Sequence, residues 1–172
     1  MNITKSNLIG HTIIFLIFSF FGLQLLQAQV RVGVNGGFPI GDSKTLSTIA
    51  GTIDLGYLFD VTDNLKVGPS AGYSHSFGDK LDTGFGVIEF DDTRFVPIYS
   101  AARFRISNIF SFGVDLGYAL SLEKSSGGGF YYSPRVSMSV SNHLNLVSAY
   151  RGISLENASW DIISFGLEIK LE

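Results

Sequence analysis

Residues 110–122 alternate strictly between two kinds of side chain. The odd positions hold only Ser, Gly, Asp or Ala, whereas the even positions are all apolar: Phe110, Phe112, Val114, Leu116, Tyr118, Leu120 and Leu122. Successive side chains of a β-strand point to opposite faces. The pattern therefore predicts a strand with one wholly apolar face and one small, polar face.

The same period of two recurs along most of the chain, and it predicts eight strands. Their ranges are 30–38, 49–59, 65–77, 95–106, 110–122, 130–140, 144–155 and 160–171. The apolar face lies at odd positions in the second, third and eighth segments and at even positions in the others. In the fourth segment we assign the even face as apolar because Arg103 and Arg105 then point the other way.

Three short connections agree with these faces. Paired residues of an antiparallel hairpin share a face, so the length of the turn determines whether parity is kept. In all three cases the two residues that flank the turn are both odd-numbered or both even-numbered, as a shared face requires. These pairs are Phe59 and Leu65, Ile106 and Phe110, and Val140 and Leu144. Both three-residue turns contain Ser-Asn, and we expect Asn108 and Asn142 to take the left-handed backbone conformation there.

The other connections are longer and more polar, at 39–48, 78–94, 123–129 and 156–159. Short turns thus alternate with long loops, which is typical of transmembrane barrels with short periplasmic turns and longer external loops. With an even number of strands, we expect both termini of the barrel domain on the side of the short turns.

The central parts of the apolar faces carry no Asp, Glu, Lys or Arg. A Lys or Arg at mid-depth on a lipid-facing surface would cost about 2–4 kcal/mol. The opposite faces are rich in Gly and Ser, which suit the crowded interior of an eight-stranded barrel. We therefore predict an all-β fold, an eight-stranded antiparallel up-and-down transmembrane β-barrel. The alternative is a soluble secreted barrel that binds an apolar ligand inside.

Aromatic residues gather near the ends of the segments, as expected for two girdles at the membrane interfaces. Near the short turns these are Phe59, Phe104 and Phe110. Toward the long loops they are Phe38, Phe77, Tyr118, Phe130, Tyr132, Tyr150 and Trp160.

The first 28 residues have a different composition. Lys5 is the only charged side chain before Arg31, residues 8–26 are nearly all apolar, and Ala28 follows. This layout is typical of a secretory signal. We predict a cleavable signal peptide at 1–28 and an outer-membrane barrel domain at 29–172. An uncleaved transmembrane anchor is the alternative.

Three segments resemble the small outer-membrane β-barrel domain family of Gram-negative bacteria, the OmpA/OmpX-type eight-stranded barrels. They are Gln27-Ala28-Gln29, residues 95–106 and the last strand at 162–169. The resemblance implies a porin-like barrel in the cell outer membrane with a non-enzymatic, structural or surface-interaction role. Its implied partners are membrane lipid, lipopolysaccharide and the outer-membrane assembly machinery. These barrels commonly end in an aromatic residue, whereas this chain ends in Leu171-Glu172.

Charged residues also occur on the predicted lumenal faces. Buried charges must be paired, so we expect a structural polar network that contains Asp54, Arg103, Arg105, Asp115, Arg135 and Glu168. Asp54 and Asp115 are the expected acceptors for Arg103 and Arg135. A selective or gated pore is the alternative, although eight strands leave no open channel.

Some small barrels of this type modify lipid, so a lipid-modifying enzyme is a further alternative. His75, Ser76 and Asp79 are the candidate residues near the external end of the third strand. Adjacent strand residues point to opposite faces, so His75 and Ser76 cannot form a nucleophile–base pair directly. Three scattered His and no Cys predict neither a metal cluster nor a cofactor. The net charge of −3 excludes a strongly basic nucleic-acid binder.

The loop at 78–94 is the most distinctive connection. Its apolar tract predicts that the third and fourth strands continue above the membrane as a protruding hairpin. Such a hairpin offers an edge for strands of an extracellular protein partner, or an acidic site for divalent cations that bridge lipopolysaccharide. The candidate partner residues are Asp79, Asp82, Phe85, Glu89, Phe90, Asp91 and Asp92.

Overall fold

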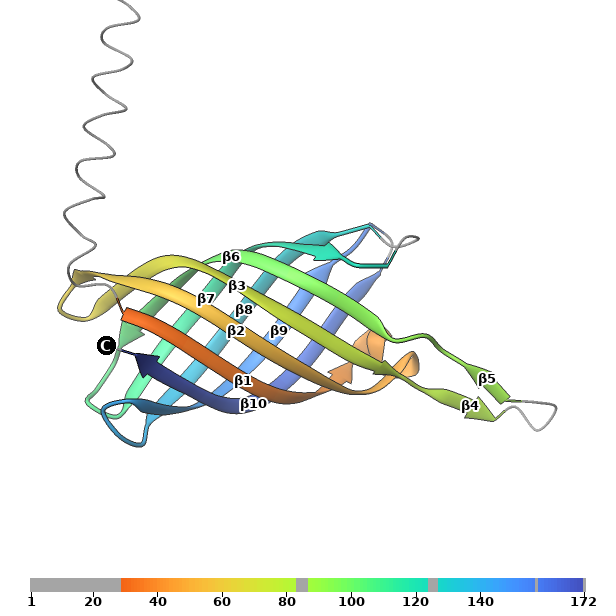
Figure 1. The fold of residues 1–172 in the computed structure, drawn as a ribbon, viewed down its shortest axis with the longest axis horizontal. Coiled ribbons are helices and arrows are strands. Elements are labelled where there is room, and N and C mark those ends of the chain that lie inside the picture. The colour runs from red at the N-terminus through yellow and green to blue at the C-terminus, as the bar shows by residue number, and fades with distance from the viewer. Residues whose placement is uncertain (1–28, 83–86, 124–126, 157, 172) are drawn as a thin grey trace, which may run out of the picture.

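A computed structural model describes residues 29–82, 87–123, 127–156 and 158–171. These residues form a closed barrel of eight antiparallel strands (Figure 1). The strands are β1 (Gln29–Ile40), β2 (Ser47–Thr62), β3 (Leu65–Gly78), β6 (Thr93–Arg105), β7 (Phe110–Ser121), β8 (Gly129–Ser139), β9 (Leu144–Ser154) and β10 (Ser159–Leu171). The predicted fold class is confirmed. The predicted signal peptide lies outside the described residues.

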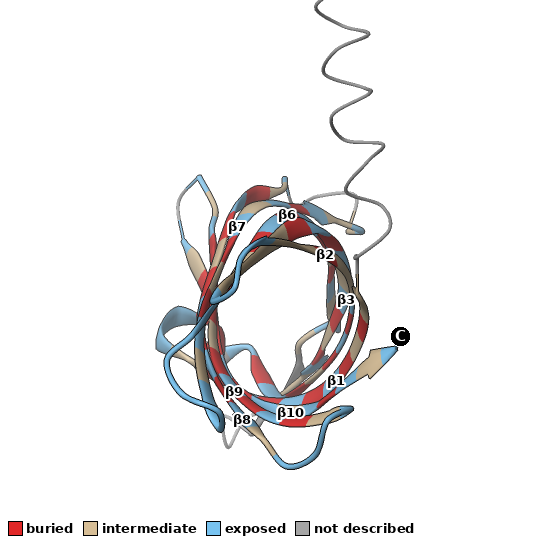
Figure 2. Ribbon diagram, turned by 90° about the vertical axis from the view of Figure 1, so that its left-hand side faces the viewer, coloured by how far each residue is buried: buried red, intermediate tan, exposed pale blue. Residues whose placement is uncertain are grey.

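The sheet closes on itself between its first and last strands. Around the barrel the order is β1-β10-β9-β8-β7-β6-β3-β2, and β1 also pairs with β2. The closing register runs from Val30 opposite Leu171 to Ile40 opposite Asp161. Viewed from its end, the barrel is a continuous ring (Figure 2). A closed ring leaves no sheet edge with unpaired amides, which a hydrocarbon environment requires.

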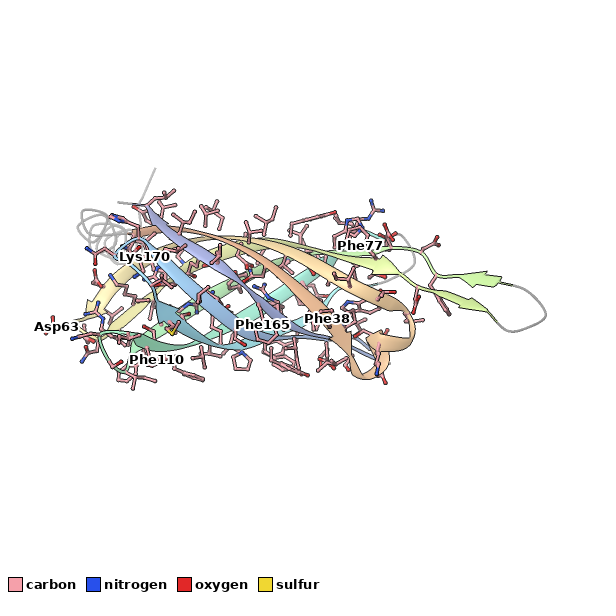
Figure 3. All side chains as sticks on the ribbon, turned by 90° about the horizontal axis from the view of Figure 1, so that it is seen from below. Phe38, Asp63, Phe77, Phe110, Phe165 and Lys170 are labelled. Carbon is pink, nitrogen blue, oxygen red and sulfur yellow. The ribbon has the colours of Figure 1, made fainter. Side chains whose placement is uncertain are left out.

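The face assignments made from parity are confirmed in all eight strands. In β7, Leu116 is 47% exposed and points outward, whereas the preceding residue, Asp115, points into the lumen and is 2% exposed. The outward face carries large apolar side chains along its whole length (Figure 3). The soluble alternative is therefore wrong, because it requires these side chains to fill the interior.

The third and fourth barrel strands continue past the barrel wall as a hairpin of β4 (Lys80–Asp82) and β5 (Val87–Glu89). Lys80 lies opposite Glu89, and Asp82 lies opposite Val87. The hairpin protrudes from the end of the barrel opposite the C-terminus (Figure 1). The predicted protruding hairpin is confirmed.

The short turns depend on hydroxyl groups and not on asparagine. The Oγ of Ser107 and the Oγ of Ser141 accept hydrogen bonds from the backbone N–H groups two and three residues later, at 3.0–3.3 Å. Thr62 has the same role in the third turn. No described non-glycine residue has a positive φ. The expectation of left-handed Asn108 and Asn142 is therefore wrong.

A short 3-10 helix, η2 (Gly41–Thr45), follows β1 at the hairpin end of the barrel. The hydroxyl of Ser43 lies 2.7 Å from the carbonyl oxygen of Ile40 and 2.8 Å from that of Asp161, so it fixes the helix to β10. Gly41 has a φ of 61°, which favours glycine. Across the described ranges, no helix is long and apolar enough to cross a membrane.

Candidate functional site

The lumen holds three buried ion-pair clusters. In the first, Arg103 of β6 donates a hydrogen bond from Nη1 to Oδ1 of Asp115 on the neighbouring strand β7, at 2.5 Å. The predicted pairing of Arg103 with Asp115 is confirmed. Both side chains are nearly inaccessible to water, so each charge depends on the other for stabilisation.

The second cluster is centred on Asp54. Arg151 donates from Nη1 to Oδ1 at 3.0 Å and from Nη2 to Oδ2 at 2.6 Å. Tyr99 donates to Oδ1 and Asn35 donates to Oδ2, at 3.1 and 3.0 Å. The predicted pairing of Asp54 with Arg103 or Arg135 is wrong. The parity of each strand shows which of its side chains point into the lumen. It does not specify at what depth in the lumen they lie, and therefore which of them meet.

The third cluster surrounds Glu168. Arg135 donates to Oε2 at 2.6 Å, while Arg31 and Asn145 donate to Oε1 at 3.0 and 3.1 Å. The donors come from β8, β1 and β9, so one carboxylate joins three strands to its own, β10. Arg135 was expected to pair with Asp54 or Asp115, and this expectation is corrected to Glu168.

Arg105 lies outside these buried clusters. It is exposed, and no carboxylate within the described ranges makes a salt bridge with it. It lines a cavity of about 310 Å³ at the short-turn end, together with Arg31, Lys66, Arg103 and Lys170. We call this cavity the vestibule. In Figure 3, Asp63, Phe110 and Lys170 mark the same end of the barrel.

An apolar cluster fills the lumen toward the hairpin end. Its largest member, Trp160, is 5% exposed, and its ring centroid lies 6.0 Å from that of Phe95. Its Nε1–H donates to Oγ of Ser76 at 3.1 Å. The other members include Ala50, Tyr99, Ala119, Tyr131, Ile153 and Ile162. The assignment of Trp160 to the outer aromatic girdle is wrong, because even positions of β10 face inward.

The base of the hairpin is held by Asp92. Its Oδ1 accepts a hydrogen bond of 2.9 Å from the backbone N–H of Gly78. Its Oδ2 lies 2.9 Å from Nε2 of His75. The Gly78 N–H, and after it the His75 ring, lower the pKa of Asp92. His75 also stacks on Phe77, with ring centroids 4.5 Å apart.

His75 and Ser76 point to opposite faces, as predicted. His75 lies on the outer surface, whereas Ser76 is fully buried and accepts the hydrogen bond from Trp160. The described residues contain no group of three His, Cys, Asp or Glu that could hold a metal ion.

The remaining residues of the predicted partner loop are spread along the hairpin. Asp79 and Phe90 are joined by a backbone hydrogen bond of 2.9 Å at its base. Asp91 is exposed beside Asp92. Asp82 and Glu89 lie in the hairpin strands β4 and β5, and Phe85 lies outside the described residues. Arg94 connects this region to the next loop through Glu123 at 3.0 Å.

Several residues of the lumenal network were missed as specific partners. Arg151, Arg31 and Asn145 hold two of the three carboxylates, and Tyr99 contributes a hydroxyl. All four have the inward parity of their strands, so strand parity was the signal that could have found them. Parity selects the candidates, but it does not assign the pairs.

Comparisons with known proteins agree on the architecture. The family model described as the outer membrane protein beta-barrel domain matches residues 13–170. Among curated proteins, no sequence matches this chain.

Solved structures of similar fold include three distinct barrels. The attachment invasion locus protein Ail of Yersinia pestis, in complex with the heparin analogue sucrose octasulfate, has a TM-score of 0.59 and 14% identity, covering 84% of this chain and 97% of that chain. The N-terminal β-barrel domain of Pseudomonas aeruginosa OprF has a TM-score of 0.57 and 10% identity, covering 84% and 98%. A de novo designed transmembrane β-barrel has a TM-score of 0.54 and 14% identity, covering 83% and 95%. At such identities the shared property is the fold.

Proposed function

The chain belongs to the outer membrane protein beta-barrel domain family and lies in the cell outer membrane, and we propose that it serves there as a closed, non-enzymatic scaffold. In this proposal the barrel anchors the β4–β5 hairpin and displays it to partners outside the cell. The single observation that carries the proposal is a filled lumen beneath a hairpin that extends beyond the barrel wall.

The packing of the lumen supports a barrel that passes no solute. The ion-pair clusters span it at mid-depth, and the apolar cluster fills it above them. The void between Tyr99, Arg103 and Glu168 measures about 10 Å³, which is room for roughly one water molecule. A permeating ion would have to separate pairs such as Arg151 and Asp54, whose charges stabilise each other in a dry interior.

The geometry of the outer rim supports a role without catalysis. Nucleophilic catalysis requires a Ser hydroxyl held against a His that a third group orients. Here Asp92 orients His75 on the outer surface, while the Ser76 hydroxyl is held by Trp160 inside the barrel. The base and the nucleophile are therefore separated by the barrel wall.

The hairpin region carries more acidic than basic side chains. Its acids are Asp79, Asp82, Glu89, Asp91 and Asp92, against Lys80 and Arg94. Ail was crystallised with a polysulfated ligand, but an acidic hairpin repels such a polyanion. We propose an extracellular protein partner with a basic surface, which pairs with the edge of β4 or β5 that the two-stranded sheet leaves without a neighbouring strand.

The other partners follow from the membrane setting. Membrane lipid contacts the outward apolar faces, lipopolysaccharide surrounds the base of the hairpin, and the outer-membrane assembly machinery inserts the barrel. We also propose that residues 1–28 are a signal peptide removed after Ala28. In support, Gln29, the first residue after that bond, already belongs to β1.

Surface proteolysis of intact cells tests the display role. Protease added outside should cut the hairpin between β4 and β5 and leave the rest of the barrel intact. Cleavage that occurs only after the cells are lysed would overturn the proposed orientation.

Deletion of residues 83–89 then tests the partner. The deletion variant should still insert, with heat-modifiable gel mobility, and should lose binding to a basic protein surface such as immobilised lysozyme. Deletion of residues 124–126 in the loop after β7 is the matched control, and it should keep binding. Equal binding by both variants would show that the hairpin is not the contact element.

A further inference from the structure

We propose that the vestibule is a binding site for a soluble oxyanion of the phosphate class. It lies at the short-turn end of the barrel, which faces the periplasm in bacterial barrels, and it is remote from the displayed hairpin. Its ligand would therefore come from the periplasm and not from outside the cell.

The lining of the vestibule is strongly cationic. Five basic side chains line it, namely Arg31, Lys66, Arg103, Arg105 and Lys170, against one acidic side chain, Asp63. They come from β1, β3, β6 and β10, so positive charge surrounds the cavity and is not confined to one wall. Clefts lined by one sign of charge concentrate ions of the opposite sign.

The interior carboxylates do not neutralise this charge. The buried network has four cations, Arg31, Arg103, Arg135 and Arg151, and three anions, Asp54, Asp115 and Glu168. Nearer the opening, Lys66 is neutralised by Asp60 at 2.6 Å. Arg105 and Lys170 form no salt bridge with any carboxylate in the part of the chain that the structure describes.

The basic side chains of the vestibule also act on one another. The ammonium of Lys170 is repelled by Arg31, Arg105 and Lys66, which reach the same cavity from other strands, and it is attracted by Glu168. β6 and β10 lie on opposite sides of the barrel, so Arg105 and Lys170 approach the cavity from opposite walls. An anion placed between them would relieve the repulsion and form an attractive interaction with each group.

The floor of the vestibule has donors to spare. The Nε–H groups of Arg31 and Arg103 are buried and have no acceptor, and buried donors without acceptors are unfavourable. Hydroxyl and amide groups of the turns complete the wall, including Ser107, Asn108, Ser141 and Asn142. Phosphate-class oxyanions present several acceptor oxygens in the geometry that guanidinium groups prefer.

The position of the site favours a soluble ligand over a lipid headgroup. The vestibule is lined by residues of the short turns and by inward-facing strand residues, whereas lipid surrounds the outer wall of a membrane barrel. Inorganic pyrophosphate is a suitable probe because it is compact and carries several negative charges.

The test uses the chain purified from the outer membrane and reconstituted in phosphatidylcholine nanodiscs. Calorimetric titration with pyrophosphate should give saturable binding of one anion per barrel, which weakens as salt is raised because screening reduces charge attraction. The double variant Arg105→Gln/Lys170→Gln should bind about tenfold more weakly or worse, since it removes two charge-assisted contacts. The conservative variant Arg105→Lys/Lys170→Arg should retain binding.

Arg94→Gln at the opposite end of the barrel is the matched control, and it should bind like the unaltered chain. Absence of saturable binding, or equal weakening by Arg94→Gln, would overturn the proposal. The proposal would also be overturned if, without pyrophosphate, the vestibule were occupied only when phosphatidylglycerol replaces phosphatidylcholine in the nanodiscs. That result would make a lipid headgroup the ligand of the site. Heat-modifiable mobility verifies folding, and if the double variant fails to fold, the single variant Arg105→Gln and the conservative pair decide.

Discussion

Arg151 of β9 holds Asp54 of β2 through two parallel hydrogen bonds that cross the lumen, although these strands are not neighbours in the sheet. The two residues are 97 positions apart in the chain. Each therefore depends for its partner on correct closure of the whole barrel. This fork-to-fork geometry is the strongest form of arginine–carboxylate contact.

Breaking this pair should strongly destabilise the barrel. Asp54→Asn leaves the buried guanidinium of Arg151 without its counter-charge, and we expect a loss of about 3–5 kcal/mol in the free energy of unfolding. Urea titration in lipid vesicles, followed by heat-modifiable mobility, measures the loss. Asp60→Asn, which breaks a solvent-accessible pair with Lys66, should cost less than about 1 kcal/mol. Equal losses would show that the lumenal pair is solvated.

Gly117 should not tolerate a side chain. A Cβ atom there would collide with the carbonyl oxygen of Ile98 and with Tyr99 on the adjoining strand β6. Gly117→Ala should therefore lower stability by about 1–3 kcal/mol. The matched variant is Gly51→Ala, because nothing lies within 4 Å of its added methyl group. Unfolding midpoints of the two variants in urea give the comparison, and a neutral Gly117→Ala would contradict the close strand contact.

The outward face should resist charge in proportion to membrane depth. Leu116→Arg, at mid-strand, should destabilise the inserted barrel by about 2–4 kcal/mol, and Ile106→Arg, beside a short turn, by about 0–1 kcal/mol. Both wild-type side chains are exposed on the outer face. Equilibrium folding into vesicles measures both, and equal penalties would argue against a bilayer around β7.

Trp160 should be shielded from lipid. It is the only tryptophan, and it lies inside the barrel against Phe95. Lipids brominated in their acyl chains should therefore quench the intrinsic fluorescence weakly. In the variant Trp160→Phe/Phe130→Trp the tryptophan moves to an outward position that is 52% exposed, and quenching should be strong. Strong quenching of the unaltered chain would restore the girdle assignment.

The hairpin base should loosen only in strong acid. Since the pKa of Asp92 is lowered in the folded state, its contribution to local stability is fully present above the ordinary aspartate pKa of about 3.9 and is lost as pH falls through the lower folded pKa. Hydrogen exchange at the Gly78 amide measures the opening. Asp92→Asn should abolish this acid dependence, and an opening midpoint above the ordinary aspartate pKa would contradict the contact.

The faces of the strands were predictable, whereas the partners inside the barrel were not. Period-two alternation and turn length together determine which side chains point inward. The stagger between strands determines which inward residues meet, and no local pattern encodes it. Arg103 and Asp115 were assigned correctly because they lie on neighbouring strands. Asp54 and Arg135 were assigned wrongly because their partners lie on strands that do not pair with their own, β9 for Asp54 of β2 and β10 for Arg135 of β8.

Two other errors have local causes. Trp160 was assigned by its nearness to a strand end, although the parity of β10 already indicated an inward position. In the short turns, asparagine was credited with the role that Ser107 and Ser141 have, because a hydroxyl that accepts two amide N–H groups stabilises the turn without a left-handed residue.

Closure of the barrel depends on the pairing of β1 with β10. Val30 of β1 lies opposite Leu171 of β10, so the barrel is closed only when these two strands have paired. Before this pairing forms, β1 and β10 each have an unpaired edge, and each edge can pair with a strand of another chain. The β1–β10 pairing therefore protects the barrel from edge-to-edge association with other chains, in addition to closing it.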